Sequence, residues 1–349
     1  MNRINIIHQY GEPSHFKALY DCAEEYGYIV SEQIIISKKA VVKRFLIGIK
    51  KKKFILSFQQ LIRDIQNRKA LRTLRGEILI VGLAPYDYRL TKYEKLWARN
   101  RCFYFTSCTD WSGDTCIEGS LKNRNRFEKV LVSCFTGAFC VSNKAKMGVE
   151  NLLPNSTVVN HAINVNDYSY KEKYNNHKRI IFIGGLTERK NIRIIFNWLK
   201  LNPESECDFY FAGSGPLLPD VISLAENDNR VHYLGVLTKQ EIMHTLCEYD
   251  YLILPSMEEP FGIVLIEALA SGIPCIVSDA DGPSEIISDG KTGFVFSLSN
   301  SMASFSRVMN KALLIKENEY RELCKMSRIE AYKFDSDTII KKWMTLLQK

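Results

Sequence analysis

The second half of the sequence alternates short apolar runs with stretches of helical period. Apolar runs of six to eight residues occupy 179–186, 208–215, 230–235, 249–256 and 274–279. Segments with apolar residues every three or four positions, such as 191–200 and 238–249, separate these runs. Parallel strands need such a crossover between them, and helical crossovers cover both faces of the sheet. We therefore predict a doubly wound α/β domain in this half.

The first half carries a similar but less regular pattern. Strands are expected near 4–8, 28–36, 77–83, 102–106 and 138–142. After the first of these, Ser14 is expected to cap a helix that runs to about Tyr26, with Gly27 at its end. This half is therefore also predicted to form a parallel sheet with helices.

A polar stretch without periodicity, residues 164–178, separates the two halves and is expected to be a linker. We thus expect an N-terminal domain over 1–163 and a C-terminal domain over 179–334. Residues 335–349 have the pattern of an amphipathic helix, which we expect to pack back on the N-terminal domain. Two such domains create a cleft between the carboxyl ends of their strands, where doubly wound sheets bind ligands.

Composition narrows the class of protein. A hydrophobic content of 46% excludes a mainly disordered chain. The ten cysteines form no CxxC pair and lie mostly in apolar runs, so we expect buried, reduced thiols in a cytoplasmic protein. No run approaches the roughly 20 apolar residues that span a bilayer, and the N-terminus lacks the apolar stretch of a signal peptide. Any membrane contact is expected to be peripheral.

The positive charge is concentrated in one segment. Between Lys38 and Arg75 there are 13 lysines and arginines and one acid, Asp64, which gives this segment a net charge of +12. The whole chain has a net charge of +8, so the rest of the chain has a net charge of −4. Its centre, "KRFLIGIKKKKFILSF" at 43–58, mixes lysines with phenylalanine, leucine and isoleucine. A nucleic-acid arm, a membrane contact and the outer face of a helix are the three interpretations.

The stretch after residue 254 is the most informative for chemistry. An apolar strand ends at Ser256, Pro260 and Gly262 interrupt regular structure, and a helix is expected to begin near Ile263. The free N–H groups at the start of that helix suit an anionic phosphate.

Two acids flank the start of this helix. Glu259 lies in the loop at the strand's carboxyl end, and Glu267 lies one turn inside the helix. Carboxylates on either side of a phosphate site can accept hydrogen bonds from sugar hydroxyls. An isolated pair with this spacing would more often be a solvated loop acid and a helix-surface acid.

The surrounding motifs decide between these interpretations. The run from "FAGSGPL" through "VHYLGVLTKQEI" and "LPSMEEPFGIVLIEALASGIPCIVSDADGPSEII" to "DGKTGFVF" resembles glycosyltransferase family 4 (group 1), the retaining sugar-nucleotide transferases. The resemblance is dense over residues 179–296 and thin over the N-terminal half. It implies the GT-B architecture, two Rossmann-like doubly wound domains facing a central cleft. It also implies transfer of a sugar, with retention, from a nucleotide-sugar donor to a hydroxyl of a glycan acceptor.

The resemblance also assigns roles to residues of this sequence. It implies that Glu259 holds hydroxyls of the donor sugar, that Glu267 takes the ribose hydroxyls and that Lys190 neutralises the donor diphosphate. A fixed cation lowers the barrier because the leaving diphosphate gains charge in the transition state. The donor-binding residues that we expect are Gly11, Gly184, Arg189, Gly235, Val236, Phe261, Gly262, Ile263, Val264, Glu267 and Glu285.

The sequence departs from the family pattern at three places. Gly185 stands where the family commonly has an arginine, so Arg189 is the candidate for a second diphosphate cation. Thr109 stands where many members have a catalytic histidine, and Asp110 beside it is the candidate residue for positioning the acceptor. Asp279-x-Asp281 looks like a metal-binding pair, but we assign it no metal and expect no cofactor.

The resemblance favours a membrane role for the basic segment. The commonest acceptors of similar proteins are lipid-linked oligosaccharides, and the N-terminal domain is the one that binds the acceptor. We expect Lys50, Lys51, Lys52, Lys53 and Phe54 to contact an anionic membrane surface on its inner, cytoplasmic face. The alternative is that the apolar residues pack on their own sheet. For the whole protein, a catalytically degenerate transferase-like partner subunit stays open, whereas nucleic acid is not an expected partner.

Overall fold

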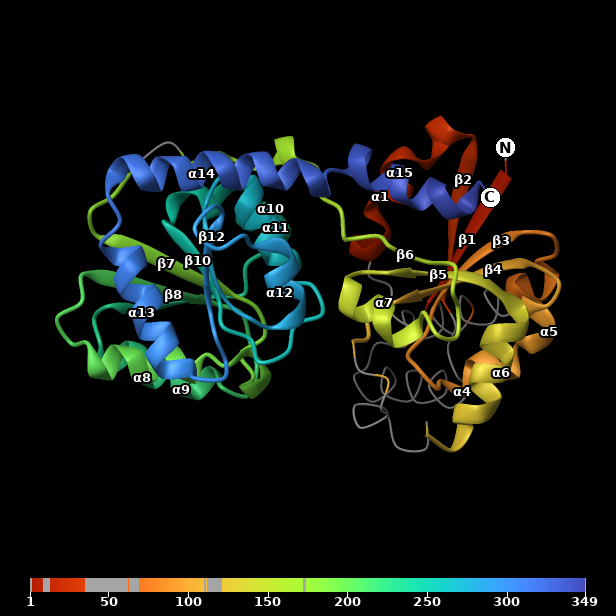
Figure 1. Ribbon diagram of the computed structural model, residues 1–349, viewed down its shortest axis with the longest axis horizontal. Helices are drawn as coiled ribbons and strands as arrows, with labels where there is room; N and C mark the ends of the chain where they lie inside the picture. Colours follow the sequence, from red (N-terminus) through yellow and green to blue (C-terminus); the bar gives the residue numbers. More distant parts are fainter. Residues whose placement is uncertain are drawn as a thin grey trace. The chain divides into compact units, whose positions relative to one another are not determined.

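The computed structural model describes residues 2–8, 13–34, 62, 69–109, 111, 121–171 and 174–348. The chain divides into two compact units, of which unit 1 comprises Met1–Asn160 with Ile340–Lys349 and unit 2 comprises His161–Ile339. Each unit is built on a parallel six-stranded sheet with helices packed on it (Figure 1). Both predicted sheets are therefore confirmed.

Unit 1 has the sheet order β2-β1-β3-β4-β5-β6. Its strands are β1 (Asn2–His8), β2 (Tyr28–Ile34), β3 (Ile78–Gly82), β4 (Arg101–Thr106), β5 (Phe135–Cys140) and β6 (Ser156–Val158). Its helices are α1 (Lys17–Cys22), α4 (Tyr88–Lys92), α5 (Glu94–Trp97), α6 (Arg124–Cys134), α7 (Asn143–Val149) and most of α15 (Ser336–Leu347), with 3₁₀ turns at Pro13–Phe16, Ala23–Tyr26 and Leu121–Asn123. In this order the chain starts at β1, adds β2 on one side and then adds β3 to β6 on the other side, as in a doubly wound sheet.

The first helix of unit 1 differs from the expectation at its start. Phe16, and not Ser14, is the cap of α1, and a 3₁₀ turn from Pro13 to Phe16 precedes it. Short 3₁₀ turns are frequent at helix ends, and a proline at the first position fits one because its missing N–H is not needed there. The predicted end is correct: Gly27 closes the segment in the left-handed region with φ = 81°.

Unit 2 has the sheet order β12-β11-β10-β7-β8-β9. Its strands are β7 (Lys178–Ile183), β8 (Cys207–Ala212), β9 (Val231–Gly235), β10 (Tyr251–Leu254), β11 (Cys275–Ser278) and β12 (Gly293–Phe296). Its helices are α8 (Arg193–Leu201), α9 (Leu218–Asn227), α10 (Lys239–Thr245), α11 (Ile263–Ala270), α12 (Asp281–Ile286), α13 (Ser301–Leu313) and α14 (Glu317–Ala331). Figure 1 shows α8, α9 and α13 on one side of this sheet and α10, α11 and α14 on the other.

The expected linker is part of unit 2. Among its described residues, Lys171 is buried and its Nζ lies 3.1 Å from Oδ1 of the buried Asp250. The Asp250 carboxylate also accepts hydrogen bonds from the Asn175 side chain and from the backbone N–H of Arg179. A buried ion pair needs such additional hydrogen bonds to offset its desolvation. The boundaries of the unit lie instead at Asn160/His161 and Ile339/Ile340.

The last helix of the chain returns to unit 1. The ring of Trp343 on α15 is 1% exposed, and its centroid lies 4.3 Å from that of Phe139 and 6.1 Å from that of Phe105. The guanidinium of Arg101 donates to the carbonyl oxygens of Leu346 and Leu347 at 2.8 and 2.9 Å. The helix is thus held by an aromatic core and by an arginine that satisfies its final carbonyls. No helix in the described part of the chain has both the length and the apolarity of a membrane span.

We expect Trp343→Ala to lower the free energy of unfolding by about 3–5 kcal/mol, because it removes a fully buried indole and leaves a cavity. Urea unfolding followed by far-ultraviolet circular dichroism measures this change. The control is Val132→Ala on α6, where the side chain is 56% exposed. An equal effect of the two substitutions would contradict the packing of α15.

Candidate functional site

The strands of unit 2 converge at their carboxyl ends through backbone contacts. The N–H of Gly184 donates to Ala212 O at 3.0 Å, and that of Gly213 donates to Gly235 O at 2.7 Å. A Cβ added to Gly213, where φ is 142°, would lie 1.8 Å from the carbonyl oxygen of Gly184. Only glycine allows so close an approach. These strand ends therefore meet through backbone atoms, with no side chain between Gly184 and Gly213.

The candidate charged residues lie at the switch point of this sheet. From β7 the chain adds β8 and β9 on one side, and from β10 it adds β11 and β12 on the other side. The order of the strands therefore reverses between β7 and β10, which are parallel neighbours. Lys190 follows β7 in a 3₁₀ turn (Glu188–Lys190), and Glu259 follows β10. In open α/β sheets, ligands bind outside the carboxyl ends of strands at such a point. The topology thus brings together two residues that are 69 positions apart.

Lys190 and Glu259 form an ion pair between Nζ and Oε2. Their side chains are 15% and 10% exposed, so both are largely shielded from solvent. The hydroxyl of Ser256 donates to the same carboxylate oxygen at 3.5 Å. The pair places a cation and a carboxylate together at the switch point.

Arg189 joins the same two loops through different atoms. Its carbonyl oxygen accepts the N–H of Met257 at 2.9 Å, and its guanidinium donates to Glu258 O at 3.2 Å. Asn191 then ends the turn with φ = 53°, a left-handed conformation that asparagine tolerates better than most residues. The guanidinium of Arg189 is therefore directed at the loop after β10.

Helix α11 begins where the sequence predicts. Gly262 is its cap with φ = 90°, a conformation that favours glycine, and Ile263 is the first helical residue. The Leu265 N–H donates to Gly262 O at 2.9 Å, whereas the N–H groups that precede it in the first turn have no helical carbonyl to donate to, and the helix dipole adds positive potential at this end. Phe261 precedes the cap and is buried, whereas Ile263 and Val264 are half-buried.

Glu267 lies deeper than its expected role requires. It is 8% exposed, and Oε1 accepts a hydrogen bond of 3.0 Å from the hydroxyl of Tyr168. Burial raises the pKa of Glu267, and the Tyr168 hydrogen bond and the charge of Lys239 oppose this shift in part. Burial and the neighbouring Glu267 likewise raise the pKa of Tyr168. The two side chains form a buried polar pair beneath the first turns of α11.

Helix α12 braces the loop that carries Glu259. The N–H of Gly282 donates to Glu259 O at 2.9 Å, and a Cβ at Gly282 would lie 2.5 Å from that oxygen and from the Phe261 nitrogen. The hydroxyl of Ser278 donates to Ser256 O. Gly282 at the start of the "GPSEII" segment and Ser278 of β11 thus hold the loop between Ser256 and Phe261 in place.

Other expected residues lie around this centre. Glu285 is exposed on α12, and Val236 is 68% exposed directly after Gly235, which ends β9 with φ = 78°. Asp279 accepts hydrogen bonds from the Ser297 hydroxyl at 2.7 Å and from the Leu298 N–H at 2.9 Å, so its carboxylate holds the loop after β12. Gly11, Lys50, Lys51, Lys52, Lys53, Phe54 and Asp110 lie outside the described residues.

Sequence patterns gave no indication of three residues near this centre. Tyr168 comes from the segment that was expected to be a linker, and Gly282 was not among the expected site residues. His161 is 4% exposed, and its ring centroid lies 4.9 Å from that of Phe261 at an interplanar angle of 64°. Each of these contacts joins segments about 20 to 100 residues apart, and no local period encodes such a contact.

Comparison with known proteins supports the sequence resemblance. Residues 168–333 match the family model described as glycosyl transferases group 1. An uncharacterized 41.2 kDa protein in the cps region of Klebsiella pneumoniae is 31% identical over 155 residues, which are 44% of this chain and 41% of that protein. The N,N'-diacetylbacillosaminyl-diphospho-undecaprenol alpha-1,3-N-acetylgalactosaminyltransferase of Campylobacter jejuni is 28% identical over 148 residues, which are 42% of this chain and 38% of that protein. The alignments thus span less than half of these relatives' own lengths.

A solved structure extends the comparison to the whole chain. Anabaena Alr3699/HepE, solved in complex with UDP and glucose, has a TM-score of 0.70 and covers 100% of both chains at 16% identity. At this identity the likeness concerns the fold. The two parallel six-stranded sheets with their helices are those predicted for a GT-B fold.

We expect Glu267→Gln to stabilise the protein at neutral pH and to have little effect in acid. Because burial raises the pKa of Glu267 in the folded state, the folded protein binds this proton more tightly than the unfolded chain. The resulting stability is present below the unfolded value near 4.5 and is lost as the pH rises through the raised pKa. Glutamine keeps an acceptor for Tyr168 without the charge.

Thermal unfolding at several values between pH 4 and pH 8 measures this difference. The control is Glu226→Gln, at an exposed position of α9. A stability difference between Glu267→Gln and the parent that does not grow with pH would contradict the buried position of this carboxyl.

Proposed function

Through residues 168–333 the chain belongs to the glycosyl transferases group 1 family, and on that premise we propose that it transfers a sugar from a nucleotide-sugar donor to a hydroxyl of a glycan acceptor. The observation that carries the proposal is the Lys190–Glu259 pair at the switch point of unit 2. It lies on the loops beside the N-terminus of α11, which suits a phosphate. A cation, a carboxylate and a helix N-terminus are the groups that a sugar diphosphate needs.

Each group has a distinct part in the proposed reaction. Lys190 and the first N–H groups of α11 stabilise the negative charge that develops on the departing diphosphate. Glu259 accepts hydrogen bonds from hydroxyls of the donor sugar, and Glu267 does the same for the ribose. Arg189 supplies the second cation, because Gly185 stands where the family commonly has an arginine. The donor diphosphate and Glu259 then compete for the Lys190 ammonium, so donor binding rearranges this pair.

We propose that transfer proceeds with retention and without a metal. A retaining transfer of this kind needs no protein nucleophile, because positioning of the acceptor hydroxyl and stabilisation of the leaving group supply the catalysis. Asp110 of unit 1 is the residue that we propose for positioning the acceptor. The glycine loop around Gly11 is proposed to approach the donor phosphates through its backbone.

We propose a lipid-linked glycan as acceptor and surface-polysaccharide synthesis as the process. The Campylobacter relative, whose name includes a diphospho-undecaprenol substrate, supports this choice. The cationic and apolar segment at 43–58 gives the protein a means to reach such an acceptor from the cytoplasmic face of a membrane.

A degenerate partner subunit is the second candidate, because Gly185 lacks the family arginine. Turnover of a nucleotide sugar separates the two candidates.

We expect Lys190→Ala and Glu259→Ala each to reduce turnover by at least about tenfold, since each removes a group that contacts the reacting substrate. Release of nucleotide diphosphate from the donor measures turnover, and circular dichroism verifies folding.

The matched controls are Lys200→Ala and Glu226→Ala, both at exposed positions of unit 2. Full activity of Lys190→Ala or Glu259→Ala would remove the proposed roles. An inactive parent protein with every donor and acceptor tried would favour the partner subunit.

We expect replacement of Lys50 to Lys53 by glutamine to abolish co-sedimentation with anionic liposomes, because each basic residue near the surface contributes about 1 kcal/mol. A control variant removes four exposed lysines of unit 2, Lys200, Lys291, Lys316 and Lys325. Unchanged sedimentation of the Lys50–Lys53 variant would exclude this segment as the membrane contact.

A further inference from the structure

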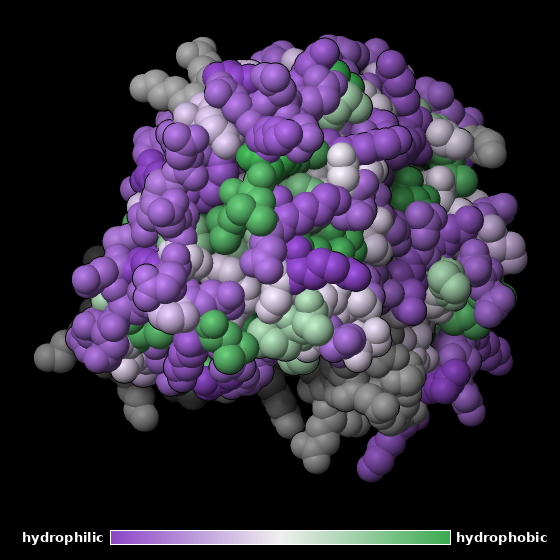
Figure 2. All heavy atoms as spheres, turned by 60° about the vertical axis from the view of Figure 1, so that its left-hand side comes forward, coloured by the Kyte–Doolittle hydropathy of each residue, from purple (hydrophilic) through white to green (hydrophobic). Residues whose placement is uncertain are grey.

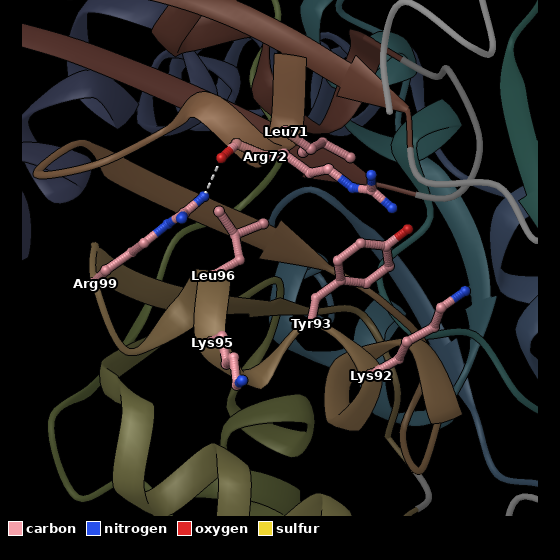
Figure 3. Close-up of a pocket in the computed structure, with 7 residues that line it drawn as sticks. All are labelled: Leu71, Arg72, Lys92, Tyr93, Lys95, Leu96 and Arg99. Carbon is pink, nitrogen blue, oxygen red and sulfur yellow. Dashed lines mark hydrogen bonds between the residues drawn. The ribbon is translucent and has the colours of Figure 1, made fainter. Parts of the chain in front are cut away.

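Unit 1 contains a pocket of about 650 Å³ that the proposed transfer does not use. Its walls are the helical turn at 69–73, the end of α4, helix α5 and the loop before β4. Of the described residues, those that line it are Leu71, Arg72, Lys92, Tyr93, Lys95, Leu96 and Arg99 (Figure 3). The volume is that of a small-molecule site.

Hydrogen bonds near the starts of β3 and β4 hold two of these walls together. The N–H of Gly76 donates to Arg99 O at 3.1 Å, and the Asn100 side chain donates to Leu74 O at 3.2 Å and accepts the N–H of Glu77 at 2.9 Å. The Arg99 guanidinium also donates to Arg72 O. This part of the pocket therefore adjoins the amino ends of the strands, whereas doubly wound sheets bind their main ligands at the carboxyl ends.

Positive charge dominates the lining. Four of the seven residues are cationic, and none is acidic. Among the residues that the structure describes, no carboxylate forms an ion pair with Arg72, Lys95 or Arg99. In Figure 3 the guanidinium of Arg72, the hydroxyl of Tyr93 and the ammonium of Lys92 lie along one side of the pocket. Such a concentration of cations in one concave site attracts an anion.

The uncharged part of the lining is apolar. Leu71 is 0% exposed and Leu96 is 5% exposed, so both contribute to a buried apolar floor. Tyr93 is half-buried and offers a ring face with a polar tip. A ligand that fits has an anionic head for the cations and an organic body for the floor. The planar guanidinium of arginine can donate two hydrogen bonds to the oxygens of one phosphate group.

We propose that this pocket binds the phosphoryl head of an organic phosphate. The Arg72 guanidinium donates to the phosphoryl oxygens, and the Lys92 ammonium on the same side adds a point charge. Arg99, whose guanidinium donates to Arg72 O, and Lys95 add to the positive potential of the pocket. Leu71, Tyr93 and Leu96 contact the attached organic group. The same chemistry occurs in an anionic phospholipid headgroup and in a free phosphorylated compound. Arg72 lies near the end of the +12 segment, so both sources of phosphate meet a positive potential on approach.

Two probes test the proposal on the full chain. Inorganic diphosphate is titrated by calorimetry, and vesicles of phosphatidylcholine with phosphatidylglycerol are used in sedimentation. The pocket variant is Arg72→Gln/Arg99→Gln, and the matched control is Arg126→Gln/Lys129→Gln, two exposed positions of α6 in the same unit. Lys95→Gln is a second pocket variant that leaves the Arg99–Arg72 hydrogen bond intact.

We expect the double pocket variant to weaken binding of at least one probe by about tenfold or more, because it removes a charge-assisted contact and a second cation of the lining. The control is expected to change binding by less than about twofold. Loss confined to diphosphate identifies a soluble phosphorylated ligand, and loss confined to vesicles identifies a lipid headgroup.

The proposed donor site is separated from the pocket by repeating the diphosphate titration with Lys190→Ala. Pocket binding persists in that variant, whatever becomes of the transferase activity. The proposal is overturned if neither probe binds the parent protein, or if the control variant loses as much affinity as the pocket variants. Diphosphate binding that depends on Lys190 and not on Arg72 and Arg99, without vesicle binding, would also overturn it.

Discussion

The loop after β10 is held by backbone hydrogen bonds from both sides, and the candidate site depends on this restraint. Met257 N donates to Arg189 O, and Gly282 N donates to Glu259 O, each at 2.9 Å. Neither bond involves a charged side chain. The positions of Lys190 and Glu259 are therefore set by the backbone. Partly buried ion pairs often contribute little net stability, so this one is better explained by function than by folding.

The same restraint determines how charge is distributed at the strand ends. Lys190 neutralises Glu259, and burial favours the protonated form of Glu267 beside Tyr168. An arriving diphosphate thus meets a lysine that is paired with a carboxylate, and a helix N-terminus. Figure 2 shows apolar patches within a mainly hydrophilic surface, whereas Lys190 and Glu259 are positioned by the sheet of unit 2 and its loops. Preorganised groups of this kind need little rearrangement when charge develops in the transition state.

Local patterns predicted what short-range physics controls. The apolar runs predicted the strands, and Pro260 with Gly262 predicted the start of α11 at Ile263, because these residues restrict the backbone wherever they occur. The dense motif run predicted the family. Local patterns did not predict the contacts that require glycine. Position 213 must be glycine because the Gly184 carbonyl oxygen, which lies in another loop, leaves no room for a Cβ.

Long-range contacts explain what the sequence did not predict. Residues 164–178 are polar and have no period, so they were expected to be a linker. Lys171 and Asp250 bury their charges against each other across the fold, and Tyr168 reaches Glu267 in the same way. Neither partner is identifiable from the residues next to it. The pocket at Leu71 and Leu96 likewise results from segments that meet only when β3 and β4 pair.

A donor screen by thermal shift tests the proposed donor site most directly, since a ligand that binds the folded state raises its melting temperature. UDP-, GDP- and ADP-sugars are each added to the full chain and to Lys190→Ala. The proposed site predicts that at least one of them raises the melting temperature of the parent protein and has a clearly smaller effect on Lys190→Ala. No stabilisation by any nucleotide sugar, or equal stabilisation of both proteins, would contradict it.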